Sequence, residues 1–112
     1  MPLVLALLLS GFALWPPPVR ALAVPAYRGY VNDYADLLSP ATEARLERAL
    51  QSFDLSDSTQ IAVLTIPSLE GEDLEGFSIR TVEGWKIGQK GKDNGVLFLV
   101  VKNDRKMRIE VG

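Results

Sequence analysis

The sequence contains no cysteine and no histidine. Without cysteine there is no disulfide and no thiolate nucleophile, and without histidine there is no Ser-His-Asp triad, phosphohistidine or Cys/His zinc site within this chain. Any catalysis must therefore use carboxylates, hydroxyls, Lys, Arg or a metal held by oxygen ligands. The absence of cysteine is also consistent with a compartment outside the cytoplasm, where free thiols are a liability.

The sequence also lacks an excess of charge of either sign. Its 112 residues include 12 Lys and Arg against 14 Asp and Glu, which gives a formal net charge of -2. The basic residues are scattered rather than clustered, so we exclude nucleic acid as a partner. The hydrophobic content of 47% is ordinary for a globular protein, and the length allows one domain.

One long apolar run stands at the N-terminus. Residues 3–15, "LVLALLLSGFALW", carry no charge, and as a helix they would span about 20 Å, against roughly 30 Å for the hydrocarbon core of a membrane. Three prolines follow, and Ala21 and Ala23 then form an A-x-A cleavage pattern. We predict a signal peptide over residues 1–23, cleaved after Ala23, and a secreted or periplasmic domain over residues 24–112. No Lys or Arg precedes the run, so retention as a weak uncleaved anchor is the alternative.

Hydrophobic periodicity predicts two helices and three strands in this domain. Apolar residues at helical spacing predict helices over 40–53 and about 73–86. Runs rich in apolar and β-branched residues predict strands over 59–66 and 96–101. An alternating pattern predicts a third strand over 107–111, with Met107, Ile109 and Val111 on one face.

The connections between these elements indicate an α/β fold with a mixed sheet. The first two strands and the helix between them fit a parallel, right-handed βαβ unit, whereas five residues join the last two strands as an antiparallel hairpin. Helices are expected on the faces of this sheet, and the apolar stripe of the first helix and Trp85 are assigned to the core. Residues 27–38 show no period and indicate an ordered arm. The chain stops with the third strand, so we predict that the C-terminal part of the domain is missing.

Acidic residues are the candidate functional groups. The carboxyl ends of parallel strands meet at one edge of a sheet, and Asp33, Asp36 and Asp104 are expected there together with the acidic loop 70–73. A cation such as Ca²⁺ takes about six to eight oxygen ligands, which side chains and carbonyls of these loops can supply. We therefore predict a metal site at this edge. The alternative is that these are solvated loop carboxylates that cap helices.

A second pair of polar residues, Asp93 and Asn94, precedes the strand over 96–101. This position is roughly 20 Å from Asp104, so one ion cannot bind both groups. The pair is either a separate metal site at the opposite edge or a structural turn in which Gly95 takes a positive φ.

Two stretches of the sequence resemble the TPM domain family. They are "YVNDYADLLSP" at 30–40 and "GWKIGQKGKDNGVLFLVVKNDRKMRIEVG" at 84–112, with a helix-strand-helix pattern between them. The resemblance implies an α/β/α sandwich around a four-stranded sheet, outside the cytoplasm or in the thylakoid lumen of a photosynthetic source. It also implies further chain beyond the last Gly, which in many bacterial members includes a membrane helix and so gives membrane association. Relatives resemble calcium binders or an acid phosphatase of photosystem repair.

These observations leave two functions open. The first is an extracytoplasmic interaction or assembly and repair module that binds Ca²⁺ or another divalent cation, with a protein partner such as a membrane complex. The second is an acid phosphatase in which an Asp serves as nucleophile or holds a metal that activates water. We favour the first, because no set of polar residues in the sequence must converge on one pocket.

Overall fold

The computed structural model describes residues 21–89 and 94–112. Residues 1–20 of the predicted signal peptide lie outside the described residues, and so does Asp93.

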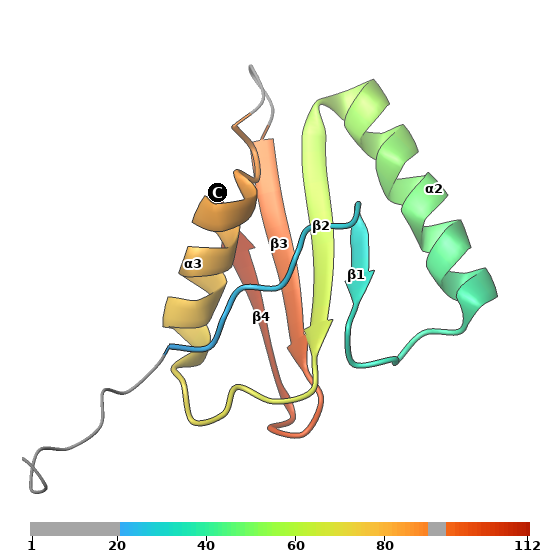
Figure 1. The fold of residues 1–112 in the computed structure, drawn as a ribbon. Helices are drawn as coiled ribbons and strands as arrows, with labels where there is room; N and C mark the ends of the chain where they lie inside the picture. Colours follow the sequence, from blue (N-terminus) through green and yellow to red (C-terminus); the bar gives the residue numbers. More distant parts are fainter. Residues whose placement is uncertain (1–20, 90–93) are drawn as a thin grey trace, which may run out of the picture.

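The fold is built on a four-stranded sheet with the strand order β1-β2-β3-β4 (Figure 1). The strands are β1 (Val31–Asp33), β2 (Thr59–Ile66), β3 (Asn94–Val101) and β4 (Lys106–Val111). β1, β2 and β3 run parallel, and β4 pairs antiparallel with β3. The predicted mixed sheet, with its parallel unit and its hairpin, is confirmed.

β1 corrects the expectation of an arm without strand structure over residues 27–38. Val31 pairs with Val63 of β2, and the buried Asn32 side chain donates a hydrogen bond to the Val63 carbonyl at 3.1 Å. Three residues are too few for a period of two to be visible in the sequence. β1 is therefore stabilised by its pairing with β2, and its own sequence pattern did not reveal it.

The first helix of the described chain, α2 (Pro40–Asp57), begins where Ser39 accepts a hydrogen bond from the Thr42 backbone N–H at 3.2 Å. Ser and then Pro at these positions are typical of a helix start. The helix ends where Ser58 adopts a left-handed conformation. It therefore runs four residues beyond the predicted range of 40–53, because its last turn has no Gly or Pro to stop it earlier.

The second helix, α3 (Leu74–Trp85), matches the predicted range to within a residue at each end. Asp73 caps it by accepting from the Gly76 N–H at 2.8 Å, and Lys86 ends it in a left-handed conformation. α3 lies over β3 and β4, whereas α2 packs against β1 and β2 from the other side of the sheet (Figure 1). The three layers confirm the α/β/α arrangement.

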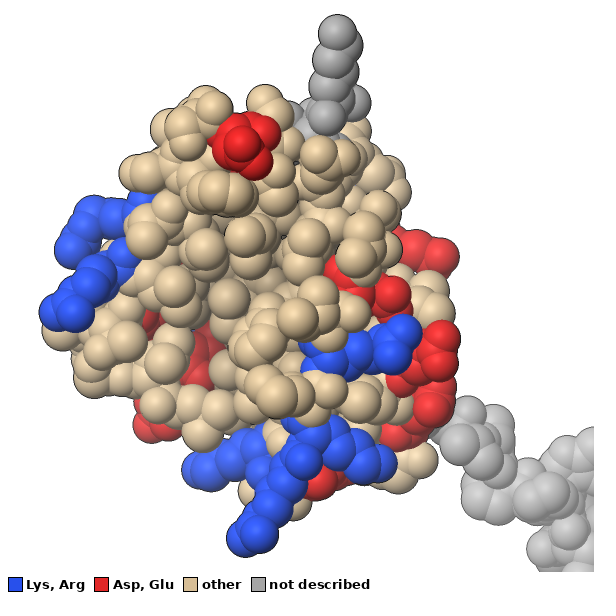
Figure 2. All heavy atoms as spheres, turned by 180° about the vertical axis from the view of Figure 1, so that it is seen from behind, with Lys and Arg blue, Asp and Glu red and all other residues tan. Residues whose placement is uncertain are grey.

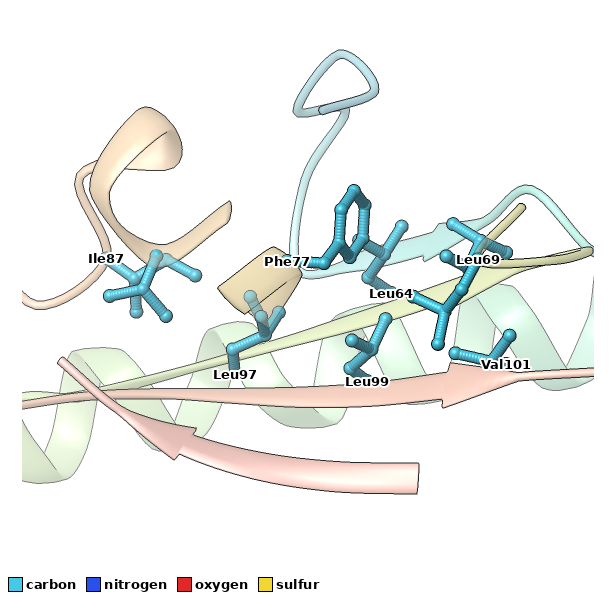
Figure 3. Packing of buried hydrophobic residues seen from close by; sticks show 10 residues of the cluster. Leu64, Leu69, Phe77, Ile87, Leu97, Leu99 and Val101 are labelled. Atoms are coloured by element: carbon cyan, nitrogen blue, oxygen red, sulfur yellow. The ribbon is translucent and has the colours of Figure 1, made fainter. Parts of the chain in front are cut away.

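The core lies between α3 and the sheet. Leu64, Leu97 and Leu99 project from β2 and β3 toward Phe77 of α3, and all four are fully buried (Figure 3). Burial of each such side chain contributes roughly 1.5–3 kcal/mol before entropy is counted. This layer therefore supplies most of the hydrophobic stabilisation.

The apolar stripe of α2 does not belong to this core, so its assignment was wrong. No residue of α2 is buried, and Phe53 is 42% exposed. The helix rests on the narrow β1 and β2 side of the sheet, which is too small to cover it. Trp85 is half-buried: its ring lies 5.2 Å from that of Tyr27, and its Nε1 donates to the Pro25 carbonyl at 2.8 Å.

β4 has its apolar side chains on the uncovered side of the sheet. Arg108 and Glu110 point toward α3, where Glu110 accepts from the Ser78 hydroxyl at 3.0 Å. Met107 and Ile109 are each 61% exposed on the opposite face. We call the six side chains on that side of the hairpin the open apolar face; they are Val96, Phe98, Val100, Met107, Ile109 and Val111.

Candidate functional site

The carboxyl edge of the sheet forms as the sequence predicts. Because β1, β2 and β3 are parallel, their last residues lie at one edge, and Asp33 is in register with Thr65, which is in register with Val100. The turn that holds Asp104 follows β3 at the same edge. β2 stands between β1 and β3, so about 10 Å separates the backbones that carry the two aspartates.

Asp33 is held by three hydrogen bonds. Its Oδ1 accepts from the Leu37 N–H at 2.9 Å and from the Thr65 hydroxyl at 2.5 Å, and its Oδ2 accepts from the Leu38 N–H at 2.8 Å. Partial burial raises the pKa of this carboxyl, but these hydrogen bonds outweigh burial and hold the pKa below its ordinary value. The carboxylate therefore acts as a clamp between β1, β2 and the loop before α2.

The other two predicted ligands at this edge do not converge with Asp33. Asp36 is exposed, with a left-handed φ of 53°, and Asp104 is half-buried in the turn after β3. Within residues 21–89 and 94–112, no three acidic side chains come together in a group that could hold a metal ion. The described side chains thus do not fit a calcium cage in this arrangement, and metal binding at this edge stays a prediction.

The carboxylates of the acidic loop are engaged in local structure. Asp73 caps α3, and Glu72 pairs with Arg80 and accepts from the Leu22 backbone N–H at 3.0 Å. Glu70 is exposed and has a left-handed φ of 53°. The interpretation of this loop as helix-capping and solvated carboxylates fits these contacts.

The opposite edge also differs from the expected turn. Asn94 is exposed at the start of β3 and pairs with Thr59, which confirms that it lies at the other end of the sheet from Asp104. Gly95 does not take a positive φ, because it is already part of the strand. A Cβ at Gly95 would lie 2.6 Å from the Gly88 Cα, so glycine is required here for close backbone contact.

Glu47 of α2 is an important residue that sequence reasoning missed. Its carboxylate accepts from the backbone N–H groups of Tyr30 at 3.0 Å and Val31 at 2.7 Å, and the Tyr30 hydroxyl donates to Asp54 at 2.6 Å. The hydrogen bond to Asp54, with burial second, raises the pKa of Tyr30 to about 12. These contacts fasten β1 to α2. A helix Glu whose partners are backbone groups leaves no pattern in a sequence.

The open apolar face is the second candidate surface. Seen from behind, the molecule has an uncharged area across its middle, with charged side chains of both signs around it and a group of Lys and Arg along its lower edge (Figure 2). Lys102 and Arg105 are exposed in the β3–β4 turn, at one end of this face. Exposed apolar area of this kind, bordered by polar residues, is typical of protein contacts.

Comparison with known proteins shows the family of this chain. The TPM domain family matches residues 31–112. The chain belongs to the TPM domain family. This TPM domain is also similar to the solution NMR structure of the N-terminal domain of a protein from P. gingivalis, with 34% sequence identity and a TM-score of 0.67. The match covers 74% of this chain and 53% of that one, so the TPM domain spans about half the length of this relative.

No curated protein gives a significant match to this TPM domain. Among the described residues, no helix has both the length and the apolar content needed to cross a membrane.

Proposed function

We propose that this TPM domain is a non-enzymatic interaction module that works outside the cytoplasm, in the assembly or repair of a protein complex. TPM domains are generally extracytoplasmic. The observation that carries the proposal is the open apolar face, where Met107 and Ile109 are each 61% exposed and Val111 is 71% exposed. Apolar side chains in a contiguous group gain free energy when a partner removes them from water.

The engagement of the acidic residues supports a binding role over a catalytic one. Asp33, Glu47 and Asp73 each accept hydrogen bonds from backbone N–H groups that hold the fold together. A nucleophilic Asp needs an oxygen free to attack, whereas the Asp33 oxygens face three donors. The acid phosphatase alternative therefore stays a prediction from family resemblance, and no step of the proposal passes through a metal.

The borders of the open apolar face indicate the chemistry of its partner. Lys102 and Arg105 stand at one end, so acidic side chains next to an apolar stripe would pair with them across the interface. An amphipathic helix with an apolar stripe about one face and acidic flanks has this arrangement. We infer such a helix as the occupant, from a protein of the same compartment or from the further chain that the family resemblance implies beyond Gly112.

Calorimetric titration with two synthetic helical peptides tests this proposal. Both peptides carry the same apolar stripe, but one has Glu along its flanks and the other has Lys. We expect the acidic peptide to bind and Ile109→Lys to weaken it by roughly tenfold or more, because about 1.4 kcal/mol of apolar contact is lost.

The matched control is Ile79→Lys, on α3, because Ile79 is 39% exposed on the other side of the sheet. This variant should leave the affinity unchanged. Equal affinity for the acidic and basic peptides, or an equal loss in the two variants, would contradict the proposal.

A further inference from the structure

The first described residues are bound by an ion pair of the domain. The Leu22 backbone N–H donates to Glu72 Oε2 at 3.0 Å, and Arg80 Nη2 donates to the Leu22 carbonyl oxygen at 3.0 Å. Glu72 and Arg80 also pair with each other. One ion pair thus holds both polar backbone groups of a single residue.

The side chains of this segment also pack against the domain. Leu22 and Val24 are partly buried and pack against the core cluster beneath α3. The Pro25 carbonyl accepts from Trp85 Nε1 at 2.8 Å. The segment crosses the α3 side of the sheet on its way to β1 (Figure 1). Among the described residues, Leu22 is therefore the first whose backbone and side chain both contact the domain.

These contacts bear on where the predicted signal peptide, or leader, would be cleaved. Cleavage after Ala23, which the A-x-A pattern predicts, would remove Leu22 and leave Glu72 and Arg80 without their backbone partners. Val19, Arg20 and Ala21 form a second pattern of the same kind, with an aliphatic residue two positions before Ala. Cleavage after Ala21 would make Leu22 the first residue of the processed chain.

We propose that export processing cleaves the Ala21–Leu22 bond and that Glu72 then binds the new α-ammonium group of Leu22. In this step a leader peptidase adds one water across the amide: the oxygen goes to the Ala21 carbonyl carbon, the C–N bond breaks, and both hydrogens of the water end on the Leu22 nitrogen. The products are a carboxylate on Ala21 and an ammonium on Leu22. The existing N–H contact to Glu72 becomes a bond between two full charges, which is shorter and stronger than a neutral one.

The surroundings fit this assignment. Ala21 is exposed, and with Leu22 it borders an open cavity of about 440 Å³ that is also lined by Glu70, Glu72 and Asp73. The new cation would therefore lie against the Glu72 carboxylate, which also pairs with the Arg80 guanidinium. The inference rests on the extracytoplasmic location proposed above and does not depend on the open apolar face.

The cut is tested by exporting the full 112-residue chain from a bacterial host and measuring the intact mass and N-terminal sequence of the periplasmic product. We expect a chain that begins at Leu22. A product that begins at Val24 would overturn the proposed cut. A chain that stays in the cell with its leader would overturn both the cut and the location, whereas the peptide titration tests the interaction proposal separately.

Capture of the α-ammonium group is tested on the processed protein with an amine-selective acylating reagent at neutral pH. Glu72→Gln should react at its N-terminus about threefold faster or more, because the carboxylate that holds the protonated amine is gone. Glu70→Gln is the control, since Glu70 lies on the same loop without a hydrogen bond to Leu22, and it should match wild type. Equal labelling rates in Glu72→Gln and wild type would overturn the capture, as would equal melting temperatures for chains begun at Leu22 and at Val24.

Discussion

The Asp33 carboxylate joins three parts of the chain, since it accepts hydrogen bonds from Thr65 of β2 and from the backbone of Leu37 and Leu38. Hydrogen bonds to a charged acceptor contribute about 1.5–3 kcal/mol each when their donors are shielded from water. At the scale of the residue, this carboxylate is therefore a structural group whose ionisation is coupled to folding.

Asp33→Asn should lower the free energy of unfolding by about 1–2 kcal/mol at pH 7, because an NH₂ group that cannot accept a hydrogen bond replaces one carboxylate oxygen. The pKa of Asp33 is lowered in the folded state, so its contribution is present above the unfolded value of about 3.8 and is lost as the pH falls through the lower folded value. The free energies of unfolding of wild type and variant, measured with urea, should thus differ at pH 7 and become equal at acidic pH.

Asp36→Asn serves as the control for this measurement. Asp36 is exposed, and Asn tolerates its left-handed backbone, so the change should stay within about 0.5 kcal/mol. If the Asp33→Asn difference were the same at every pH, the carboxylate would not be the cause.

Between elements, the backbone packs closely where Gly88, after α3, meets Gly95, in β3. A Cβ at Gly88 would lie 2.8 Å from the Gly95 Cα, and the Gly88 N–H donates to the Gln60 side chain at 2.9 Å. Gly88 also has a φ of +77°. The connection from α3 to β3 therefore packs backbone against backbone at this point.

Gly95→Ala should destabilise the domain by about 1–3 kcal/mol, because the added methyl group must displace backbone atoms. Thermal unfolding followed by circular dichroism measures this loss. Gly84→Ala, within α3, is the matched control: its nearest atom would be Val24 Cγ1 at 4.0 Å, and removal of a helix glycine should stabilise by about 0.5–1 kcal/mol. Equal changes in stability for the two variants would show that close packing is not the reason for glycine at position 95.

The sequence predicted elements well where a local pattern was long. β2 was predicted from Thr59 to Ile66 without error, because eight residues of mostly apolar and β-branched character leave little ambiguity. β1 was missed, because three residues carry no period. The role of Gly95 was misjudged because an Asn-Gly pair looks like a turn whenever the partner backbone is unseen.

The candidate site was predicted in its location and not in its contacts. Strand direction placed Asp104 at the carboxyl edge, and the expected direction of the first helix placed Asp33 there too; the register confirms that Asp33 lies at this edge. Whether a carboxylate is free depends on donors such as Thr65, which is distant in the chain. Sequence patterns describe neighbours in the chain, so they could not show that Asp33 was already engaged.

For the molecule as a whole, the distribution of its carboxylates predicts a weak response to calcium. We expect millimolar CaCl₂ to raise the melting temperature by less than about 1 °C, since no three acidic side chains in the described part of the chain could share an ion. Binding at tenfold above Kd would add about 1.4 kcal/mol, and each kcal/mol is worth about 4–8 °C in a domain of this size. A saturable rise of several degrees that Asp36→Asn or Asp104→Asn abolishes would support the predicted metal site.

The strand order has a consequence for how the chain reaches this fold. The β3–β4 hairpin closes over a short turn, whereas Val31 must find Val63 about thirty residues away, across the whole of α2. Local pairs form faster than distant parallel ones, because loop-closure entropy must be overcome first. The hairpin should therefore form early and β1 should dock late, although β1 comes first in the chain. A folding intermediate that lacks β1 would expose the edge of β2, where a chaperone could bind by adding a strand.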